Sequence, residues 1–419
     1  MLGEASGSTA TQRLQVDSEV GVLRSVLLHR PGAEIDNLTP GLLREMLFED
    51  IPYLPAMREE HDRFAALLRA EDVQVNYLED LLAEVLAQEE TRFRFIGDLL
   101  RESGAAPGGV WEHDQERLSA YLRDLSPEQL VRTAIGGLRR SDLPARERRH
   151  LSDFLTPAHP FYLLPMPNLY FMRDPAAMIG SGVLVNHMFH PARQRESLLL
   201  AYVTGHHPLF TQDEPPRWYD RSLPYPVEGG DILVLSPDVV AIGMGERTGA
   251  NAVEHIAVNL FLRKAAREVL AFQLPRQRAF MHLDTVLTMV SRQQFAVHSL
   301  IVNEGLPVFR LSPGRDGSLR IEETAGVEEA ISTALGVGEI DLIPTGGGDP
   351  IASEREQWND GANTLAVRPG VIVAYERNEA SNAEMQRHGV QVLVLEGGEL
   401  SRGRGGPRCM TMPLRREPL

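Results

Sequence analysis

Residues 227–235 read VEGGDILVL, an acidic residue and a glycine pair followed directly by an apolar run. Adjacent glycines favour a turn, and a short apolar run next to a turn signal favours a buried strand. Two other stretches resemble this one, PTGGGD at 344–349 and VLEGGEL at 394–400. Together they suggest repeated units of strand, glycine turn and strand, although three weak matches do not establish a period.

The chain on both sides of 227–235 alternates between strand-like and helix-like stretches. A strand and turn are expected in SEVGVLRSVLLHRPG (18–32), and a helix in 55–73, where Phe64, Leu67 and Leu68 fall at i, i+3 and i+4. Further strands are expected within 182–189, 231–236, 239–245, 280–290, 370–377 and 390–396, and further helices within 248–268 and 325–337. The pattern predicts a mixed α/β chain.

The pattern of apolar residues changes between residues 80 and 151, where only helical periodicity is present. Ser126, Pro127 and Gln129 form a typical helix start, with a capping serine, a proline at the first helical position and glutamine three residues after the cap. We interpret this stretch as an all-helical insertion. The expected organisation is a disordered arm at 1–14 and one domain at 15–419, interrupted at about 80–151.

Composition narrows the class of function. The 419 residues carry a net charge of −16 and are 43% hydrophobic, enough for a large core. Nucleic acids and anionic membranes select basic surfaces, so neither is expected as a partner, whereas a small cationic substrate suits an acidic protein. The first residues lack the apolar segment of a secretory signal, and no apolar run is long enough to span a bilayer. With a single cysteine, no intramolecular disulfide can form, which favours the reducing cytoplasm.

That cysteine, Cys409, lies in RGRGGPRCMTMPL (402–414). It is either a small buried apolar residue or a nucleophile. In MHLDTVLTMV (281–290), read as a strand, His282 and Asp284 are two residues apart and are expected on one face. With His298 they could also form a non-haem iron triad. Metal binding by that set, or by the pair His187 and His190, stays open at this point but lacks a tight ligand cluster in the sequence.

Carboxylates accompany the glycine turns and one aromatic loop. Glu228 and Asp231 flank the glycine pair of 227–235, either as solvated turn residues or because the glycines let the backbone approach a ligand that Glu228 then binds. In PNLYFMRDP (167–175), Asp174 follows Arg173, and the same loop contains Asn168 and Phe171. A surface ion pair is the alternative for that loop.

Taken together, a thiol, a histidine and several carboxylates indicate a nucleophile and an acid–base group around a cation. A protease is the weaker interpretation, because its substrate develops negative charge and needs N–H donors. A guanidinium is planar, permanently charged and bound best by carboxylates. The residues therefore suggest attack of a thiol on a guanidinium carbon.

The motif set resembles that of the bacterial arginine deiminases, a family of the guanidino-group-modifying superfamily. The resemblance covers about residues 15–419. It rests on EVGVLRSVLLHRPG, LFEDIPY, PNLYFMRDP, VEGGD, MHLDT, EQWNDGANTLAV and RGRGGPRCMTMPL, in that order. Where the family usually has Asp-Asp in the second motif, this chain has Glu49-Asp50. The resemblance implies an α/β fold, a five-bladed propeller of pseudo-repeated ββαβ units with a helical insertion.

The resemblance also implies an activity, the hydrolysis of L-arginine to L-citrulline and ammonia through a covalent S-alkylthiouronium intermediate on Cys409. His282 would protonate the departing ammonia and then activate water, and Glu228 would orient His282. Asp174 and Asp284 would hold the guanidinium. Substrate-binding roles would fall to Asn168, Phe171, Arg193, Arg247, Gly403 and Arg404, the two arginines Arg193 and Arg247 holding the α-carboxylate and Arg404 gating the site.

No metal or organic cofactor is expected, the partner is the small molecule L-arginine, and family members are dimers or tetramers. Arg402 and Arg408 receive no role. Agmatine deiminase, dimethylarginine hydrolase and amidinotransferases use similar residue sets, and an iron oxygenase or an arginine-binding protein without catalysis are the alternatives from other classes. The helical insertion and the two arginines favour free arginine with water as acceptor.

Overall fold

The computed structural model describes residues 13–104, 112–144, 154, 159–298, 305–315 and 317–419. The arm expected at 1–14 falls almost wholly outside the described residues, as does part of the stretch 80–151. The strands are Leu23–Leu28 (β1), Gln74–Tyr77 (β2), Leu138–Arg139 (β3), Phe161–Leu163 (β4), Ala176–Ile179 (β5), Gly182–Val185 (β6), Arg217–Tyr219 (β7), Ile232–Ser236 (β8), Val239–Met244 (β9), Glu268–Gln273 (β10), Leu287–Met289 (β11), Gln294–Val297 (β12), Val308–Pro313 (β13), Leu319–Glu323 (β14), Asp341–Pro344 (β15), Leu365–Arg368 (β16), Val371–Tyr375 (β17), Gln391–Leu395 (β18) and Met412–Arg416 (β19).

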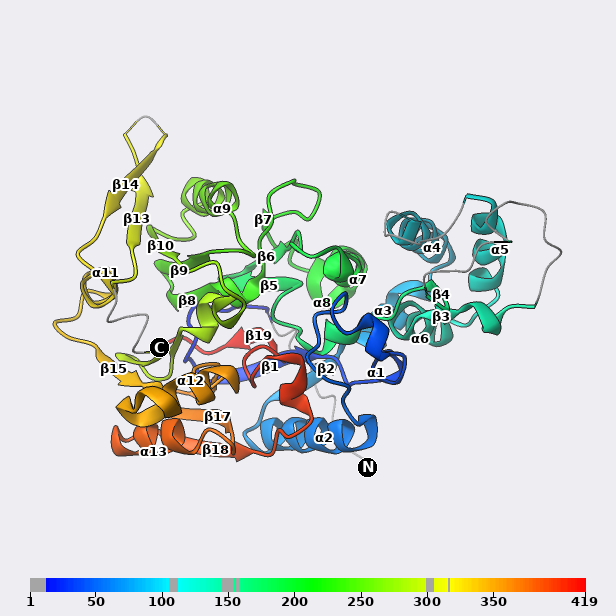
Figure 1. Cartoon of the computed structure of the whole chain (residues 1–419). Helices are drawn as coiled ribbons and strands as arrows, with labels where there is room; N and C mark the ends of the chain where they lie inside the picture. Colours follow the sequence, from blue (N-terminus) through cyan, green and yellow to red (C-terminus); the bar gives the residue numbers. More distant parts are fainter. Residues whose placement is uncertain (1–12, 105–111, 145–153, 155–158, 299–304, 316) are drawn as a thin grey trace, which may run out of the picture.

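Helices cover the faces and ends of these sheets (Figure 1). The α-helices are Ala33–Asp36 (α1), Leu54–Ala70 (α2), Leu78–Leu86 (α3), Glu89–Gly104 (α4), Glu112–Arg123 (α5), Pro127–Gly136 (α6), Gln194–His206 (α7), Pro208–Thr211 (α8), Ala250–Leu262 (α9), Val327–Leu335 (α11), Pro350–Trp358 (α12) and Glu379–Arg387 (α13). In the described part of the chain, no helix is long and apolar enough to cross a membrane.

Five sheets share one pairing pattern. In each, a first strand pairs antiparallel with a second, which pairs in parallel with a third. The sets are β19-β1-β2, β5-β6-β7, β8-β9-β10, β11-β12-β15 and β16-β17-β18. A parallel pair needs a crossover connection, and α2, α7, α9 and α13 lie in such crossovers. The chain therefore repeats one α/β unit, as the glycine-rich echoes suggest.

The three similar glycine-rich stretches occupy equivalent places in the fold. VEGGD (227–231) lies between β7 and β8, PTGGGD (344–349) between β15 and β16, and EGGEL (396–400) between β18 and β19. Each is thus in the connection from the third strand of one sheet to the first strand of the next, and not in a turn between paired strands. PNLYFMRDP precedes β5 and MHLDT precedes β11 in the same way, so all these motifs come from one type of connection.

Helices α3 to α6 occupy most of the stretch that showed only helical periodicity, and they gather at one side of the molecule (Figure 1). The prediction that this stretch is all-helical is wrong at its end, where the short strand β3 pairs with β4. The predicted start of α6 is confirmed, because the Ser126 hydroxyl accepts from the Gln129 N–H at 3.3 Å and the Gln129 side chain accepts from the Ser126 N–H at 2.9 Å. Leu82, Phe95 and Leu130 belong to the same buried apolar cluster as Leu199 of α7 and Ile256 of α9. These helices therefore share a hydrophobic core with the sheets.

One local prediction is wrong. His282 and Asp284 do not lie on a strand, because residues Leu283–Thr285 form a turn of 3-10 helix (η8) with His282 at its N-cap. The strand β11 begins only at Leu287. The Thr285 hydroxyl donates to the His282 carbonyl at 2.7 Å, and the Leu283 N–H donates to the Asp231 carboxylate at 2.8 Å. These side-chain contacts hold the tight turn where the apolar pattern favours an extended backbone.

Candidate active site

Connections between sheets, together with parts of the crossovers, line one small cavity. Its wall contains Leu47, Asn168, Phe171, Asp174, Arg193, Arg247, Arg278, Met281, His282, Thr285, Gly403, Arg404 and Cys409. The remaining two predicted site residues, Glu228 and Asp284, contact His282 and Cys409. The structure therefore brings together every residue to which the resemblance assigned a role.

His282 is held between two carboxylates. Its Nε2 lies 2.7 Å from Glu228 Oε2, and its Nδ1 lies 3.7 Å from Asp174 Oδ1. Burial alone lowers the pKa of His282, but Asp174 and Glu228 outweigh it and raise this pKa to about 9. The imidazole is therefore protonated at neutral pH and is in the form that donates a proton.

The glycine pair next to Glu228 is required by close packing. Neither Gly229 nor Gly230 has a positive φ angle, and Glu228 and Asp231 are fully buried, so the alternative of solvated turn residues is wrong. A Cβ on Gly230 would stand 2.5 Å from the His282 ring and 2.9 Å from Asp174 Oδ1, and one on Gly229 would stand 2.0 Å from the Arg173 carbonyl oxygen. Only glycine lets the VEGGD connection pass this close to His282.

Cys409 is buried and forms another part of the cavity wall. Its Sγ lies 3.6 Å from Asp284 Oδ2, and its backbone N–H donates to Asn363 Oδ1 at 3.0 Å. Burial raises the pKa of the Cys409 thiol well above its usual range, and Asp284 and Asp174 raise it further. The sulfur is a thiol at neutral pH until these carboxylates gain another positive charge.

Arg193 and Arg247 reach the cavity but are bound to carboxylates of the protein. Arg193 Nη1 lies 2.6 Å from Asp174 Oδ2, and Arg193 Nη2 lies 2.8 Å from Glu196 Oε2. Arg247 Nη1 lies 3.1 Å from Glu228 Oε2. Burial raises the pKa of Glu228, but Arg247 and His282 reverse this and lower it below the usual range. Each carboxylate beside His282 is thus matched by an arginine.

Arg404 lies in the glycine-rich loop, with a left-handed backbone at φ 65°. Its guanidinium carbon lies 3.6 Å from the centre of the Trp358 ring. Within the described residues, none of its three guanidinium nitrogens has a hydrogen-bond partner, although the side chain is buried. Gly403 packs on the aromatic loop, where a Cβ would stand 2.1 Å from the Tyr170 hydroxyl.

Sequence reasoning missed the partners of Asp284 and Cys409. Arg408 is fully buried and donates to Asp284 Oδ2 at 2.7 Å, to Glu19 Oε2 at 3.0 Å and to the Ile232 carbonyl at 2.7 Å. The signals were its position next to Cys409 and the arginine-rich loop itself. Asn363 lies in EQWNDGANTLAV, a motif that carried the resemblance without a role. Glu49 lies 2.7 Å from Arg278 of the cavity wall.

The iron triad considered from the sequence is not assembled. Over the described residues, the one group of three potential ligands within 4.8 Å is Asp174, Glu228 and His282, and its two carboxylates are paired with Arg193 and Arg247. His298 instead contacts Ser353, with Nδ1 3.2 Å from its hydroxyl, and the ring of Phe280. His187 contacts the Arg221 carbonyl, and His190 lies 3.6 Å from Glu246.

Comparison with known proteins gives one family. A family model described as arginine deiminase matches residues 44–416. Curated relatives named arginine deiminase include proteins of Bacillus cytotoxicus, 47% identical over 97% of this chain and 99% of its own, and of Listeria welshimeri, 46% identical with the same coverage. A Staphylococcus epidermidis protein named arginine deiminase 1 is also 46% identical.

Solved structures with a similar fold are far more distant in sequence. DDAH from Pseudomonas aeruginosa, solved with citrulline, aligns with a TM-score of 0.51 over 93% of this chain and 99% of its own at 14% identity. SxtG, an amidinotransferase from Microseira wollei, aligns with a TM-score of 0.53 over 97% and 98% at 14% identity. At this identity the likeness concerns the α/β fold alone.

Proposed function

The chain belongs to the arginine deiminase family, and from that premise we propose that it hydrolyses L-arginine to L-citrulline and ammonia, with Cys409 as nucleophile. The observation that supports this most directly is the cavity lined by Cys409, His282 and Asp174, with the carboxylate of Asp284 in contact with the Cys409 thiol. A cation bound between these carboxylates would have its carbon beside the sulfur and its nitrogens near the imidazole.

Binding of the substrate guanidinium is the first step. The cavity has room for about one water molecule, about 20 Å³, so its wall must move to admit an amino acid. Asp284 Oδ1 has no hydrogen-bond partner among the described residues and is placed to accept an N–H of the guanidinium. On the other side, the entering guanidinium replaces that of Arg193 beside Asp174 Oδ2. A planar cation between two carboxylates is then fixed in orientation.

The charge of the substrate activates the nucleophile. Asp284 and Asp174 help keep the proton on Cys409, and a cation on both carboxylates removes that effect. The thiol proton leaves to solvent, and the thiolate forms a bond to the guanidinium carbon. His282 then gives its proton to one terminal nitrogen, which departs as ammonia. The product of this half-reaction is the S-alkylthiouronium cation and neutral His282.

Water completes the reaction. Neutral His282, oriented by Glu228, takes a proton from a water molecule, and the hydroxide adds to the thiouronium carbon. The C–S bond breaks and the thiolate leaves. The protonated product gives a proton to the thiolate, which restores the Cys409 thiol and leaves the neutral ureido group of citrulline. His282 is protonated again, so the acid is restored for the next cycle.

Preference for arginine over its decarboxylated analogue rests on Arg193 and Arg247. Once the substrate occupies Asp174, the Arg193 guanidinium keeps one carboxylate, Glu196, and can turn toward the α-carboxylate. Arg247 Nε has no partner among the described residues and supplies a second donor. Asn168, Phe171 and Gly403 line the remaining wall, and Arg404 closes it against Trp358.

The test is release of citrulline and ammonia by the full chain from L-arginine, with agmatine in parallel. We expect turnover of arginine alone, and Arg193→Met should raise KM for arginine by about 10-fold or more, because a charge-assisted contact is lost. Arg263→Met, a change of an exposed arginine on the surface, is the control. Turnover of agmatine in preference to arginine would contradict the assignment of Arg193 and Arg247.

We also propose that the five sheets of equal pairing are the blades of a five-bladed propeller with the cavity at its centre. The repeated ββαβ order supports this, as do the five connections between sheets, since three line the cavity and the other two contact it through Glu228 and Asn363. A cytoplasmic homo-oligomer, a dimer or tetramer, is proposed from the family resemblance. Light scattering of the purified protein would test it, and a monomer at all concentrations would contradict it.

A further inference from the structure

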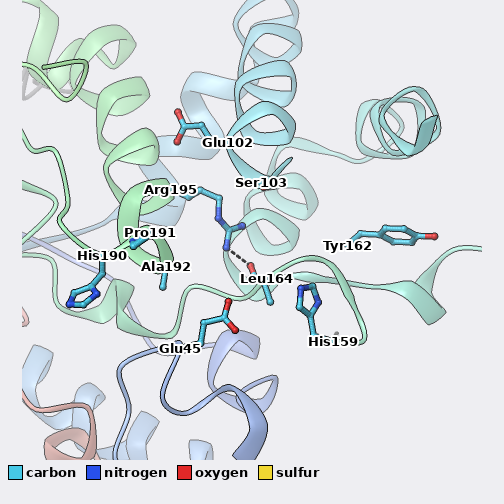
Figure 2. Close-up of a pocket in the computed structure, with 10 residues that line it drawn as sticks. All are labelled: Glu45, Glu102, Ser103, His159, Tyr162, Leu164, His190, Pro191, Ala192 and Arg195. Atoms are coloured by element: carbon cyan, nitrogen blue, oxygen red, sulfur yellow. Dashed lines mark hydrogen bonds between the residues drawn. The ribbon is translucent and has the colours of Figure 1, made fainter. Parts of the chain in front are cut away.

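A second cavity shares no lining residue with the active site. Figure 2 shows the side chains that line it. Its volume is about 280 Å³, enough for a small organic molecule. The wall is formed by residues 102–103 at the end of α4, residues 159–164 around β4, and residues 190–195, which lead into α7. It lies where the helices α4 to α6 meet the sheet-bearing part of the chain.

A buried arginine supplies the charge of this cavity. Arg195 is 5% exposed, and its Nη2 donates to the Leu164 carbonyl at 2.8 Å (Figure 2). Within the described residues, its Nη1 has no acceptor. The two carboxylates that raise the pKa of Arg195, Glu102 and Glu196, are already engaged, since Glu102 accepts two hydrogen bonds from Arg221 and Glu196 is paired with Arg193. The guanidinium is thus one of the incompletely paired charges in the protein interior.

This arrangement costs free energy that an anionic ligand would recover. Burial lowers the pKa of Arg195 to about 10, against the effect of Glu102 and Glu196, so the group remains charged at neutral pH. A buried cation with unused donors is destabilising unless an acceptor is present. A carboxylate is the group that best matches the two parallel N–H donors of a guanidinium.

The rest of the wall fixes the class of ligand. His159 Nδ1 accepts from the Phe161 N–H at 3.4 Å, so Nε2 is the nitrogen that can donate, and it has no partner among the described residues. A second donor therefore lines the cavity with Arg195. Tyr162, Leu164 and Ala192 supply apolar surface. The wall also contains the exposed Glu45 and the carboxylate of Glu102, which is paired with Arg221. One cation with carboxylates nearby fits a monocarboxylate with an apolar body better than a multiply charged phosphate.

We propose that this cavity is a binding site for a small apolar monocarboxylate, whose carboxylate pairs with Arg195. The site is separate from the proposed reaction and does not depend on it.

The test uses benzoate as the probe and isothermal titration calorimetry on the full chain. We expect saturable binding of benzoate, with Arg195→Met weakening the affinity by about 10-fold or more, because a charge-assisted pair is lost. Benzamide, which has the same shape without the charge, should bind correspondingly more weakly. Arg263→Met, which changes an exposed arginine far from the cavity in sequence, should leave the affinity unchanged.

A second variant covers the case in which Arg195→Met fails to fold. Ala192→Phe keeps Arg195 and fills the cavity, so it should also abolish binding, with folding checked by circular dichroism. Absence of benzoate binding to the unmodified chain would overturn the proposal. So would an affinity that either folded variant leaves unchanged, since benzoate would then be bound elsewhere, for instance by Arg193 and Arg247.

Discussion

His282 and Cys409 line one cavity, and the carboxylate of Asp174 acts on both of them with opposite results. Asp174 helps to raise the pKa of both groups. For the imidazole the carboxylate favours the charged form, so the proton donor is ready before a substrate arrives. For the thiol it disfavours the charged form, so the nucleophile waits for a cation. The same carboxylate thus keeps the proton on His282, which can then donate it, and keeps the proton on Cys409, which cannot attack until that proton leaves.

The strongest way to break this contrast is to remove the nucleophile. Cys409→Ala should lower kcat by about 10⁴-fold or more, because no covalent intermediate can form. The assay is citrulline release from L-arginine. The substitution removes one sulfur from a buried side chain, and binding of citrulline by calorimetry should persist. Turnover within about 10-fold of the parent protein would show that the thiol is not the nucleophile.

The effect of carboxylates on the imidazole is tested by neutralising Glu228, the partner of His282. Glu228→Gln removes a charge 2.7 Å from His282 Nε2 and should lower the pKa of His282 below its value of about 9. The alkaline limb of the pH profile of kcat should move to lower pH, and kcat at pH 8 should fall by about 100-fold. Glu254→Gln, an exposed change on α9, is the control. An unshifted alkaline limb would contradict the assignment of His282 as the acid.

For the thiol, loss of a neighbouring carboxylate charge should favour the reactive, deprotonated form. Asp284→Asn removes the charge nearest to Cys409 Sγ, so the pKa of the thiol should fall in the protein without substrate. Alkylation by iodoacetamide at pH 8 should become faster, while kcat/KM for arginine falls by about 100-fold because the guanidinium loses a carboxylate. The exposed Asp238→Asn should change neither rate. Slower alkylation in the Asp284 variant would contradict the restraint on the nucleophile.

The raised pKa of His282 also contributes to the free energy of unfolding. A histidine whose pKa is about 9 in the folded state and about 6.5 when unfolded stabilises the fold by about 3 kcal/mol below pH 6.5. That contribution disappears as pH rises from 6.5 through 9. The difference in unfolding free energy between the parent and His282→Asn, measured in urea, should shrink by this amount over the same range. A constant difference would contradict the raised pKa.

The smallest effect concerns the loop side of the cavity. Trp358→Ala removes the ring under Arg404, a contact worth about 0.5–2 kcal/mol. We expect a KM for arginine that changes by about 2- to 30-fold, with kcat altered less, because the chemistry does not involve Trp358. The exposed Tyr53→Ala is the control. A large loss of kcat with unchanged KM would place Trp358 in the chemical step.

Local sequence signals predict those elements that depend on residues close to them in the sequence. The capping residues of α6 and the strands beside the glycine turns depend on adjacent residues, and they were readable. The 3-10 turn at Leu283–Thr285 was not, because the Asp231 carboxylate that holds the Leu283 N–H lies 52 positions away. An apolar run read alone favours a strand, and a distant side chain overrides it.

The same limit applies to the site. Cys409, His282 and the carboxylates were selected by residue type and by the order of the motifs, and the structure brings them to one cavity. The pairing of Arg408 with Asp284 was not predicted, since the two residues lie 124 positions apart. The pairing of Arg193 with Asp174 was not predicted either, because β5 and β6 separate these residues in the chain. The glycine pair was noted correctly as permitting a close approach, but what approaches is His282 of the protein itself.

The central claim is that Cys409 forms a covalent bond to the guanidinium carbon. Its most direct test is intact-protein mass spectrometry of the full chain, quenched with acid within milliseconds of mixing with L-arginine. We expect a transient species heavier by the mass of arginine less ammonia, located on the peptide that contains Cys409 and absent from Cys409→Ala. Citrulline production without such a species at any time of quenching, or with the adduct on another residue, would contradict the account.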